Sequence, residues 1–188
     1  TIVFISHDLD EAMRIGDRIA MMEGGRIVQI GTPEEILKYP ADEYVQAFFR
    51  GVDPTHVFSA RDIVRDNQVT LVQKKGKGLH MGLERLQSYD REFGYVLDTH
   101  HRFLGVVSVD SLRKAMEANG EDSGLEKAFL EGVEAGHLDT TLQDLLPVIT
   151  ETPCPVPIVD ENNYYKGAIS KNRFLKTLKR EEAGTEQQ

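Results

Sequence analysis

An internal repeat in the carboxyl-terminal part of this chain constrains its fold more than any other feature. A short apolar run, an Asp, an aromatic residue, a Gly and a Ser occur twice in the same order. The matching residues are Asp98 and Asp160, Phe103 and Tyr165, Gly105 and Gly167, and Ser108 and Ser170, each pair 62 positions apart (160 − 98). Each copy predicts a strand, a polar turn, a second strand and a helix, with an amphipathic helix upstream. A repeat of this length is typical of one supersecondary unit that buries its apolar face against its twin.

Residues 1–52 show a different pattern, which predicts part of a nucleotide-binding α/β core. The near-continuous apolar run Thr1–Ser6 predicts a strand of a parallel sheet that is covered on both faces. A helix is expected over Asp8–Gly16, with acidic residues in its first turn. Polar residues at the carboxyl end of such a strand lie where α/β folds bind ligands, so Ser6-His7-Asp8 is a candidate site.

The rest of this segment predicts a hairpin and two short helices. Glu23-Gly24-Gly25 joins two apolar runs, as in a tight β-turn. Thr32 and Glu35 have the spacing of a capping box at the start of one helix, and Asp42–Arg50 predicts the next helix. Asp53-Pro54 then marks a domain boundary, because proline restricts the conformation of the residue before it.

The composition argues against several classes of function. A formal net charge of −9 argues against a general nucleic-acid-binding protein, which needs a basic face for phosphates. Cys154 is the single cysteine, so neither an internal disulfide nor a cysteine-based zinc site is expected, and this usage fits a reducing compartment. His100-His101 lies in a predicted turn without a carboxylate cluster, so no metal site is expected there. No apolar run approaches the ~18 residues that a membrane-spanning helix needs.

The segment Ser6-His7-Asp8-Leu9-Asp10-Glu11-Ala12 resembles the switch-histidine region of the ATP-binding cassette of ABC transporters. The hairpin Met21–Gly31 and the helix that begins at Thr32 also match the carboxyl end of that cassette. Phe48–Val52, followed by a tandem repeat, is similar to the ATP-binding subunits of glycine betaine/proline betaine (osmoprotectant) importers. Those subunits carry two CBS repeats after the cassette, and residues 57–180 resemble these repeats.

The resemblance implies a fold that combines α/β and α+β parts. These parts are a truncated carboxyl end of the ATPase cassette at residues 1–52, CBS repeat 1 at 57–118, CBS repeat 2 at 125–180, and an acidic tail at 181–188. Each CBS repeat is expected to have the order β-α-β-β-α. A strand built for a central sheet would expose its edges here, so residues 1–50 are expected either to dock on a neighbouring chain or to swap between chains.

The resemblance also implies a role for His7, which in the complete cassette contacts the γ-phosphate of ATP. A neutral imidazole donates one hydrogen bond and accepts another, so it can join a phosphate to a neighbouring loop. The Gly-x-x-x-x-Gly-Lys-Ser/Thr phosphate loop, the Leu-Ser-Gly-Gly signature and the apolar run ending in Asp-Glu do not occur in this sequence. We therefore expect no ATP hydrolysis by this chain alone, with ATP as a cofactor of the full-length parent.

In the CBS repeats, the resemblance implies an adenine nucleotide in a cleft, held by a hydroxyl after the glycine and by an Asp three residues later. The matching hydroxyls are those of Ser108 and Ser170, and the Asp positions are occupied by Ser111 and Arg173. The sequence thus departs from the ribose-binding pattern in both repeats. Arg173 is either a contact for a phosphate or a surface charge.

The last helix, Lys171–Arg180, indicates a second kind of regulation. Arg173, Lys176 and Arg180 share one face of this helix, ahead of the acidic tail. These cations either offset the negative end of the helix dipole, or they contact acidic lipid or the acidic tail in a way that salt weakens.

Together these patterns predict the regulatory region of the ATP-hydrolysing subunit of an osmoprotectant importer. The CBS pair is expected to dimerise and to sense ionic strength or a nucleotide. The expected partners are a second copy of the chain, the membrane-embedded permease and acidic lipid, at the cytoplasmic face of the inner membrane, with no nucleic acid and no metal. Two alternatives stay open: an adenine-nucleotide-sensing CBS module of another ABC ATPase, and a purely structural dimerisation module.

Overall fold

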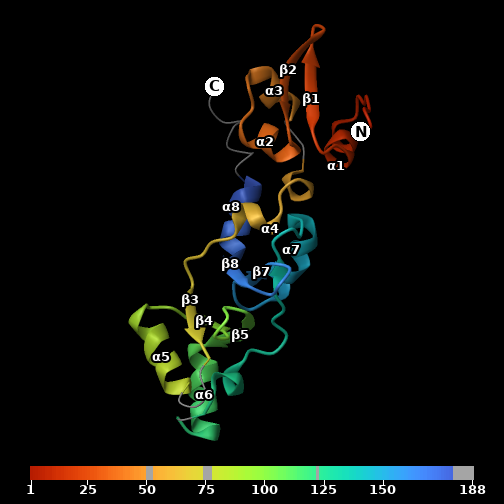
Figure 1. The fold of residues 1–188 in the computed structure, drawn as a ribbon. Coiled ribbons are helices and arrows are strands. Elements are labelled where there is room, and N and C mark those ends of the chain that lie inside the picture. Colours follow the sequence, from red (N-terminus) through yellow and green to blue (C-terminus); the bar gives the residue numbers. More distant parts are fainter. Residues whose placement is uncertain (50–52, 74–77, 122, 180–188) are drawn as a thin grey trace. The chain divides into compact units, whose positions relative to one another are not determined.

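The computed structural model describes residues 1–49, 53–73, 78–121 and 123–179 (Figure 1). By packing, the chain divides into two compact units. Unit 1 consists of Thr1–Ser59, the short stretch Thr141–Gln143 and the residues from Leu178 onward; unit 2 consists of Ala60–Thr140 and Asp144–Thr177. The four-part domain division inferred from the sequence stays a prediction.

Unit 1 contains a hairpin and short helices, most of them where the sequence predicts them. The elements are α1 (Leu9–Ile15), β1 (Ile19–Glu23), β2 (Arg26–Gly31), α2 (Pro33–Lys38), α3 (Glu43–Phe48) and the 3₁₀ turn η1 (Pro54–His56). The predicted capping box is present at α2, where the Glu35 N–H donates to the Thr32 hydroxyl and the Thr32 N–H donates to the Glu35 carboxylate at 2.9 Å. The buried side chains of this unit's core are Met13, Met21, Ile36, Val45 and Phe49.

The strand predicted at Thr1–Ser6 is wrong, because none of these residues has strand structure. A strand is stabilised by backbone hydrogen bonds to a neighbouring strand. In the part of unit 1 that the structure describes, β1 and β2 pair with each other and neither pairs with this segment. Its apolar side chains are consequently exposed, with Ile2 93% and Val3 88% accessible.

The first repeat of unit 2 is a three-stranded sheet packed against helices (Figure 1). Its elements are α4 (Ala60–Ile63), β3 (Val69–Val72), α5 (Leu79–Ser88), β4 (Phe93–Leu97), β5 (Phe103–Ser108) and α6 (Val109–Asn119). β3 and β4 are parallel, with α5 as the crossover, whereas β4 and β5 form an antiparallel hairpin. Fully buried side chains from the helices and the sheet form its core: Leu79, Leu86, Val96, Val107 and Leu112.

The second repeat has the same element order. Its elements are η2 (Leu125–Ala128, a 3₁₀ turn), β6 (Gly136–His137), α7 (Leu142–Glu151), β7 (Val156–Val159), β8 (Tyr165–Ile169) and α8 (Lys171–Lys179). β6 pairs parallel with β7, and β7 pairs antiparallel with β8. The predicted duplication is therefore confirmed: strand, helix, strand, strand and helix occur twice in the same topology.

The hairpin turns of the two repeats are also built alike. The Asp98 carboxylate accepts two hydrogen bonds from backbone N–H groups of its turn, at 2.7 and 2.8 Å. The Asp160 carboxylate does the same in the second repeat, with both bonds at 3.0 Å. His101 and Asn163, at equivalent places in the two turns, have left-handed φ angles of 64° and 63°. The Asp of the sequence repeat is thus the residue that organises each turn.

Each repeat completes the sheet of the other with the segment that precedes its own first strand. Ahead of β3, Arg65 exchanges two backbone hydrogen bonds with Ala168 at the free edge of β8, at 3.0 and 3.2 Å. Ahead of β6, the Leu130 N–H donates to the Val106 carbonyl of β5 at 2.8 Å. Val106 and Ala168 occupy equivalent places in the two repeats, so the exchange is reciprocal.

The repeated glycine makes this close crossing possible. A Cβ on Gly105 would lie 2.8 Å from the ring of Phe129, and a Cβ on Gly167 would collide with the carbonyl oxygen of Arg65. Gly167 also has a φ of 135°, which residues with side chains rarely adopt. A glycine is therefore required in each second hairpin strand by the chain segment that crosses it.

Candidate ligand-binding sites

Ser108 lies at the N-cap of α6 and is buried, with 8% of its surface accessible. Its hydroxyl accepts the Ser111 N–H at 3.0 Å, and the Ser111 hydroxyl accepts the Ser108 N–H at 2.8 Å. This capping box accounts for the serine at a position where the resemblance expects Asp. Both hydroxyls are engaged by the helix end, and Asp110 adds a negative charge to its first turn. The start of α6 is therefore poorly suited to a phosphate.

Ser170 lies at the equivalent place before α8, and its hydroxyl accepts the Arg173 N–H at 3.2 Å. Arg173 takes the position that Ser111 has in the first repeat, and it is half-buried rather than a surface charge. The first turn of α8 contains no acidic residue. The guanidinium thus adds its charge to the positive end of the helix dipole. The two equivalent helix ends consequently differ in their electrostatics, and the end with Ser170 and Arg173 favours an anion.

His7 lies in unit 1, immediately before α1, and its side chain is exposed. Beside it, the Asp8 carboxylate accepts the Glu11 N–H at 3.1 Å and caps the helix. The Ser6 hydroxyl donates to the Glu11 carboxylate at 2.8 Å. These bonds fix the start of α1 and keep the imidazole at the surface of the unit. The γ-phosphate contact expected for His7 stays a prediction.

The cationic face predicted for the last helix is only partly described. Lys176 is exposed as expected, and Leu175 beside it is 50% accessible. Arg173 lies at the border of the buried face, next to Phe174, which is 1% accessible. Arg180 and the acidic tail lie outside the described residues.

An aromatic stack joins the two repeats of unit 2. Tyr95 and Tyr165 stack with 5.2 Å between ring centroids, and Phe103 packs on Tyr165 at 6.3 Å. The Tyr95 hydroxyl donates to the Pro155 carbonyl at 2.8 Å, whereas the Tyr165 hydroxyl is buried with no hydrogen-bond partner in the described chain. Cys154 is buried in the same cluster. Burial raises the pKa of both tyrosines, and it raises the pKa of the Cys154 thiol to about 11.

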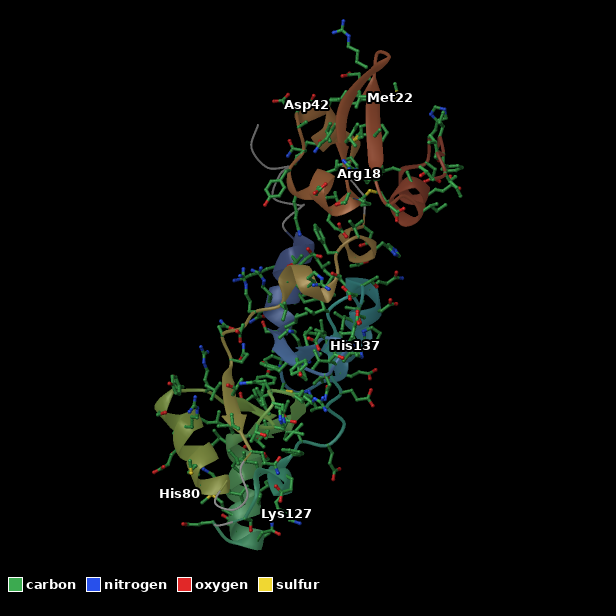
Figure 2. The ribbon with its side chains drawn as sticks, in the orientation of Figure 1. Arg18, Met22, Asp42, His80, Lys127 and His137 are labelled. Atoms are coloured by element: carbon green, nitrogen blue, oxygen red, sulfur yellow. The ribbon has the colours of Figure 1, made fainter. Side chains whose placement is uncertain are left out.

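A polar pocket that the sequence did not indicate opens beside the β7–β8 turn. Its volume is about 320 Å³, and its wall includes α4, the loop after β6 and the start of β8. His137, labelled in Figure 2, belongs to this wall. Two ion pairs line the pocket: Arg61 Nη2 lies 2.6 Å from Asp139 Oδ1, and Lys166 Nζ lies 2.9 Å from Asp160 Oδ2. Arg61 and Asp139 are 78 residues apart, so no local pattern could indicate this site.

One member of each ion pair has a shifted pKa. The hydrogen bond to Asp139 and the charge of that carboxylate raise the pKa of Arg61. The hydrogen bond from Lys166 lowers the pKa of Asp160, with help from backbone N–H groups of the turn and against the opposing effect of desolvation.

Within the described residues, no group of three or more His, Cys, Asp or Glu side chains is arranged to hold a metal ion. In the same part of the chain, no helix has both the length and the apolar character needed to cross a membrane. No protein-family profile matches the chain.

Two curated relatives align with nearly the whole chain. The glycine betaine/proline betaine transport system ATP-binding protein ProV of Salmonella typhimurium is 51% identical over 182 residues, which are 96% of this chain and 45% of ProV. The chain matches the carboxyl-terminal part of osmoprotectant-importer ATP-binding subunits. The glycine betaine transport ATP-binding protein OpuAA of Bacillus subtilis is 35% identical over 178 residues, 95% of this chain and 41% of OpuAA. The chain thus spans less than half the length of either relative.

Solved structures confirm that the two repeats form a CBS pair. A CBS domain-containing protein of Bacillus anthracis aligns with a TM-score of 0.58 and 17% identity, over 65% of this chain and 94% of that chain. OpuCA of Staphylococcus aureus aligns with a TM-score of 0.54 and 13% identity, over 63% and 97%. CBSX2 of Arabidopsis thaliana, solved in complex with AMP, aligns with a TM-score of 0.53 and 17% identity, over 64% and 95%. At these identities the likeness concerns the fold alone.

Proposed function

We propose that this chain is the regulatory region of the ATP-binding subunit of an osmoprotectant importer, and that its CBS pair binds one adenine nucleotide at the start of α8. The observation that carries the proposal is the pairing of the Ser170 cap with the half-buried Arg173 in the first turn of that helix. Backbone N–H groups at a helix start favour a phosphate, and a guanidinium can bind it through two parallel hydrogen bonds. The AMP complex of CBSX2, which has the same fold, supports this choice of ligand.

The proposal assigns one nucleotide to each chain rather than two. At the equivalent start of α6, Ser108 and Ser111 occupy each other's hydrogen bonds, and Asp110 repels an anion. The nucleotide would therefore bind asymmetrically in an otherwise symmetric pair of repeats. The repeats exchange backbone hydrogen bonds through Arg65 and Leu130. Binding at α8 would therefore also change the conformation or stability of the first repeat.

In the full-length subunit, the module would control a complete ATP-binding cassette. There His7 would contact the γ-phosphate of ATP, and the cassette would act beside a membrane-embedded permease at the cytoplasmic face of the inner membrane. The CBS pairs of two chains would also associate with each other. Sedimentation velocity should show a dimer at micromolar concentration, and a monomer throughout would contradict this part of the proposal.

Calorimetric titration of the 188-residue chain with AMP and ATP tests the nucleotide site. We expect saturable binding with a stoichiometry near one per chain. Arg173→Gln should weaken the affinity at least about tenfold, because a charge-assisted hydrogen bond contributes roughly 1.5–3 kcal/mol. Arg113→Gln, the same substitution on the exposed surface of α6, is the matched control and should leave the affinity unchanged. A stoichiometry of two, an Arg173→Gln variant with wild-type affinity, or no binding at millimolar nucleotide would refute the assignment.

Contact with acidic lipid is a second candidate function, which the surface of α8 favours. Lys171, Leu175 and Lys176 are exposed together, which combines two cations with an apolar side chain. Vesicles with and without anionic lipid should then differ in cosedimentation with the chain, and added salt should reduce the difference. Equal cosedimentation at low and high salt would exclude a role in sensing ionic strength by this route.

A further inference from the structure

We propose that the pocket beside the β7–β8 turn binds a small zwitterion that carries N–H groups, such as a free α-amino acid. The pocket shares no lining residue with the nucleotide site proposed at Ser170 and Arg173. The two assignments can therefore be tested independently of each other.

The charges of the wall determine which ligands fit. Arg61 and Lys166 supply two positive charges, while Asp139, Asp160 and Glu161 supply three negative charges. An anion would be attracted by the two cations but repelled by the three carboxylates, and a simple cation would meet the reverse conflict. A ligand with both charges can pair each end with the opposite sign. The alternation of charge in this wall thus favours a zwitterion.

Arg61 and Asp139 can exchange each other for the ligand with little loss of free energy. The Arg61 and Asp139 side chains are 60% and 67% accessible, so water already competes for their contact. A carboxylate of the ligand can take over the guanidinium of Arg61, while an ammonium of the ligand takes over the released Asp139. The number of charge-assisted hydrogen bonds is then the same or larger after binding. Asp160 stays in place during this exchange, because its other oxygen holds two backbone N–H groups of the turn.

The cationic end of the ligand must carry N–H groups. The wall offers carboxylate oxygens and the side chain of Asn162, which accept hydrogen bonds from an ammonium but gain none from a quaternary ammonium. Quaternary ammonium groups bind best over aromatic rings, and no aromatic residue belongs to the described lining of this pocket. The nearby ring of Tyr164 is already approached by Lys166 at 5.9 Å and by Arg102 at 6.0 Å. The pocket should therefore prefer an α-amino acid, for example proline, over glycine betaine.

The size and the polar lining of the pocket determine the expected affinity. A volume of about 320 Å³ is at the small end of the range for ligand pockets, which suits a single amino acid. Leu138 is the one apolar residue of the described lining, so burial of carbon contributes little. We expect binding in the millimolar range, since most of the gain comes from exchanging existing ion pairs.

Ligand-observed NMR titration of the 188-residue chain with L-proline, glycine betaine, acetate and ethylammonium tests the proposal. L-Proline should bind saturably, glycine betaine at least about tenfold more weakly, and the two singly charged compounds weakest of all. Arg61→Gln and Asp139→Asn should each weaken proline binding at least about fivefold, because each removes one of the two charges that pair with the ligand. Lys171→Gln on α8, outside the pocket, is the matched control and should change nothing.

Several results would overturn the assignment. Equal binding of acetate and proline would make the pocket a simple anion site, and tighter binding of glycine betaine would refute the requirement for N–H groups. Absence of saturable binding, or wild-type proline binding by Arg61→Gln, would leave the pocket without this function. The circular dichroism spectrum of Arg61→Gln shows whether the variant is still folded. If the wild-type chain does not bind AMP, the nucleotide site is refuted, whereas the proposal of a zwitterion site is unaffected.

Discussion

The two stacked tyrosines between the repeats should respond differently to the same substitution by phenylalanine. Their rings lie 5.2 Å apart in one buried cluster, so Tyr95→Phe and Tyr165→Phe both preserve the stacking. The hydroxyl of Tyr95 donates to the Pro155 carbonyl at 2.8 Å. The hydroxyl of Tyr165 is equally withdrawn from solvent but has no partner in the described part of the chain. The pair therefore isolates the effect of one hydrogen bond.

The magnitudes follow from this difference. Tyr95→Phe deletes a hydrogen bond and leaves a carbonyl without its donor, which should lower the free energy of unfolding by about 1–2 kcal/mol. Tyr165→Phe removes a desolvated hydroxyl that gains nothing in the folded state, so it should be neutral or raise that free energy by up to about 1 kcal/mol. A difference of about 2 kcal/mol corresponds to roughly 4–8 °C in Tm for a chain of this size.

Urea unfolding followed by circular dichroism, together with thermal scans, measures both variants against the wild type. The double variant should show additive changes if neither hydroxyl depends on the other. A Tyr165→Phe variant that is as destabilised as Tyr95→Phe would refute the reasoning. It would mean that the Tyr165 hydroxyl forms a hydrogen bond in solution, for example to an ordered water.

Three further predictions concern Gly167 at the contact between the repeats, the single cysteine, and the absence of ATP hydrolysis by the chain alone. Gly167→Ala should lower the free energy of unfolding by more than about 2 kcal/mol, because its φ of 135° and the carbonyl of Arg65 both oppose a Cβ. Gly120→Ala, with a φ of 84° and open space around it, is the control at about 1 kcal/mol, and equal losses in urea titrations would contradict the steric argument. The Cys154 thiol should react slowly with iodoacetamide at pH 8 in the native chain and quickly in urea. Because burial raises its pKa, the protonated thiol favours the folded state, and its contribution to the free energy of unfolding should fall as pH rises from about 9 to about 11. Fast alkylation of the native chain would show that the cysteine is accessible. The chain alone should release no phosphate from ATP above a His7→Ala control, and steady release in a coupled assay would refute that expectation.

The sequence predicted the parts of the fold that depend on short-range patterns. The spacing of the repeated Asp, Gly and Ser predicted both hairpins and the helices after them, because each residue acts within its own turn or strand. Asp98 and Asp160 organise their turns, and Thr32 with Glu35 forms a capping box, as local hydrogen bonding requires. The family resemblance was carried by other short motifs, chiefly Ser6–Ala12 and the hairpin Met21–Gly31.

The failures concern features that depend on distant parts of the chain. Thr1–Ser6 has the composition of a buried strand, but composition cannot supply the neighbouring strands that such a segment needs. The sequence left Arg173 as a phosphate contact or a surface charge, and its half-buried position follows from how α8 packs on the second repeat. The pocket was missed because Arg61 and Asp139 meet only after the repeats interlock. A charged residue 78 positions from its partner leaves no periodic signal.

The reciprocal crossing of the two repeats suggests how such a module could have arisen. A single repeat made as a separate chain would carry an open sheet edge and, ahead of its first strand, a segment shaped to cover that edge on an identical copy. Two such chains would close each other with the two-fold symmetry typical of homodimers. Joining their genes would preserve that arrangement while freeing each half to diverge. The divergence is visible at the two helix ends, where one copy has Ser111 and the other has Arg173.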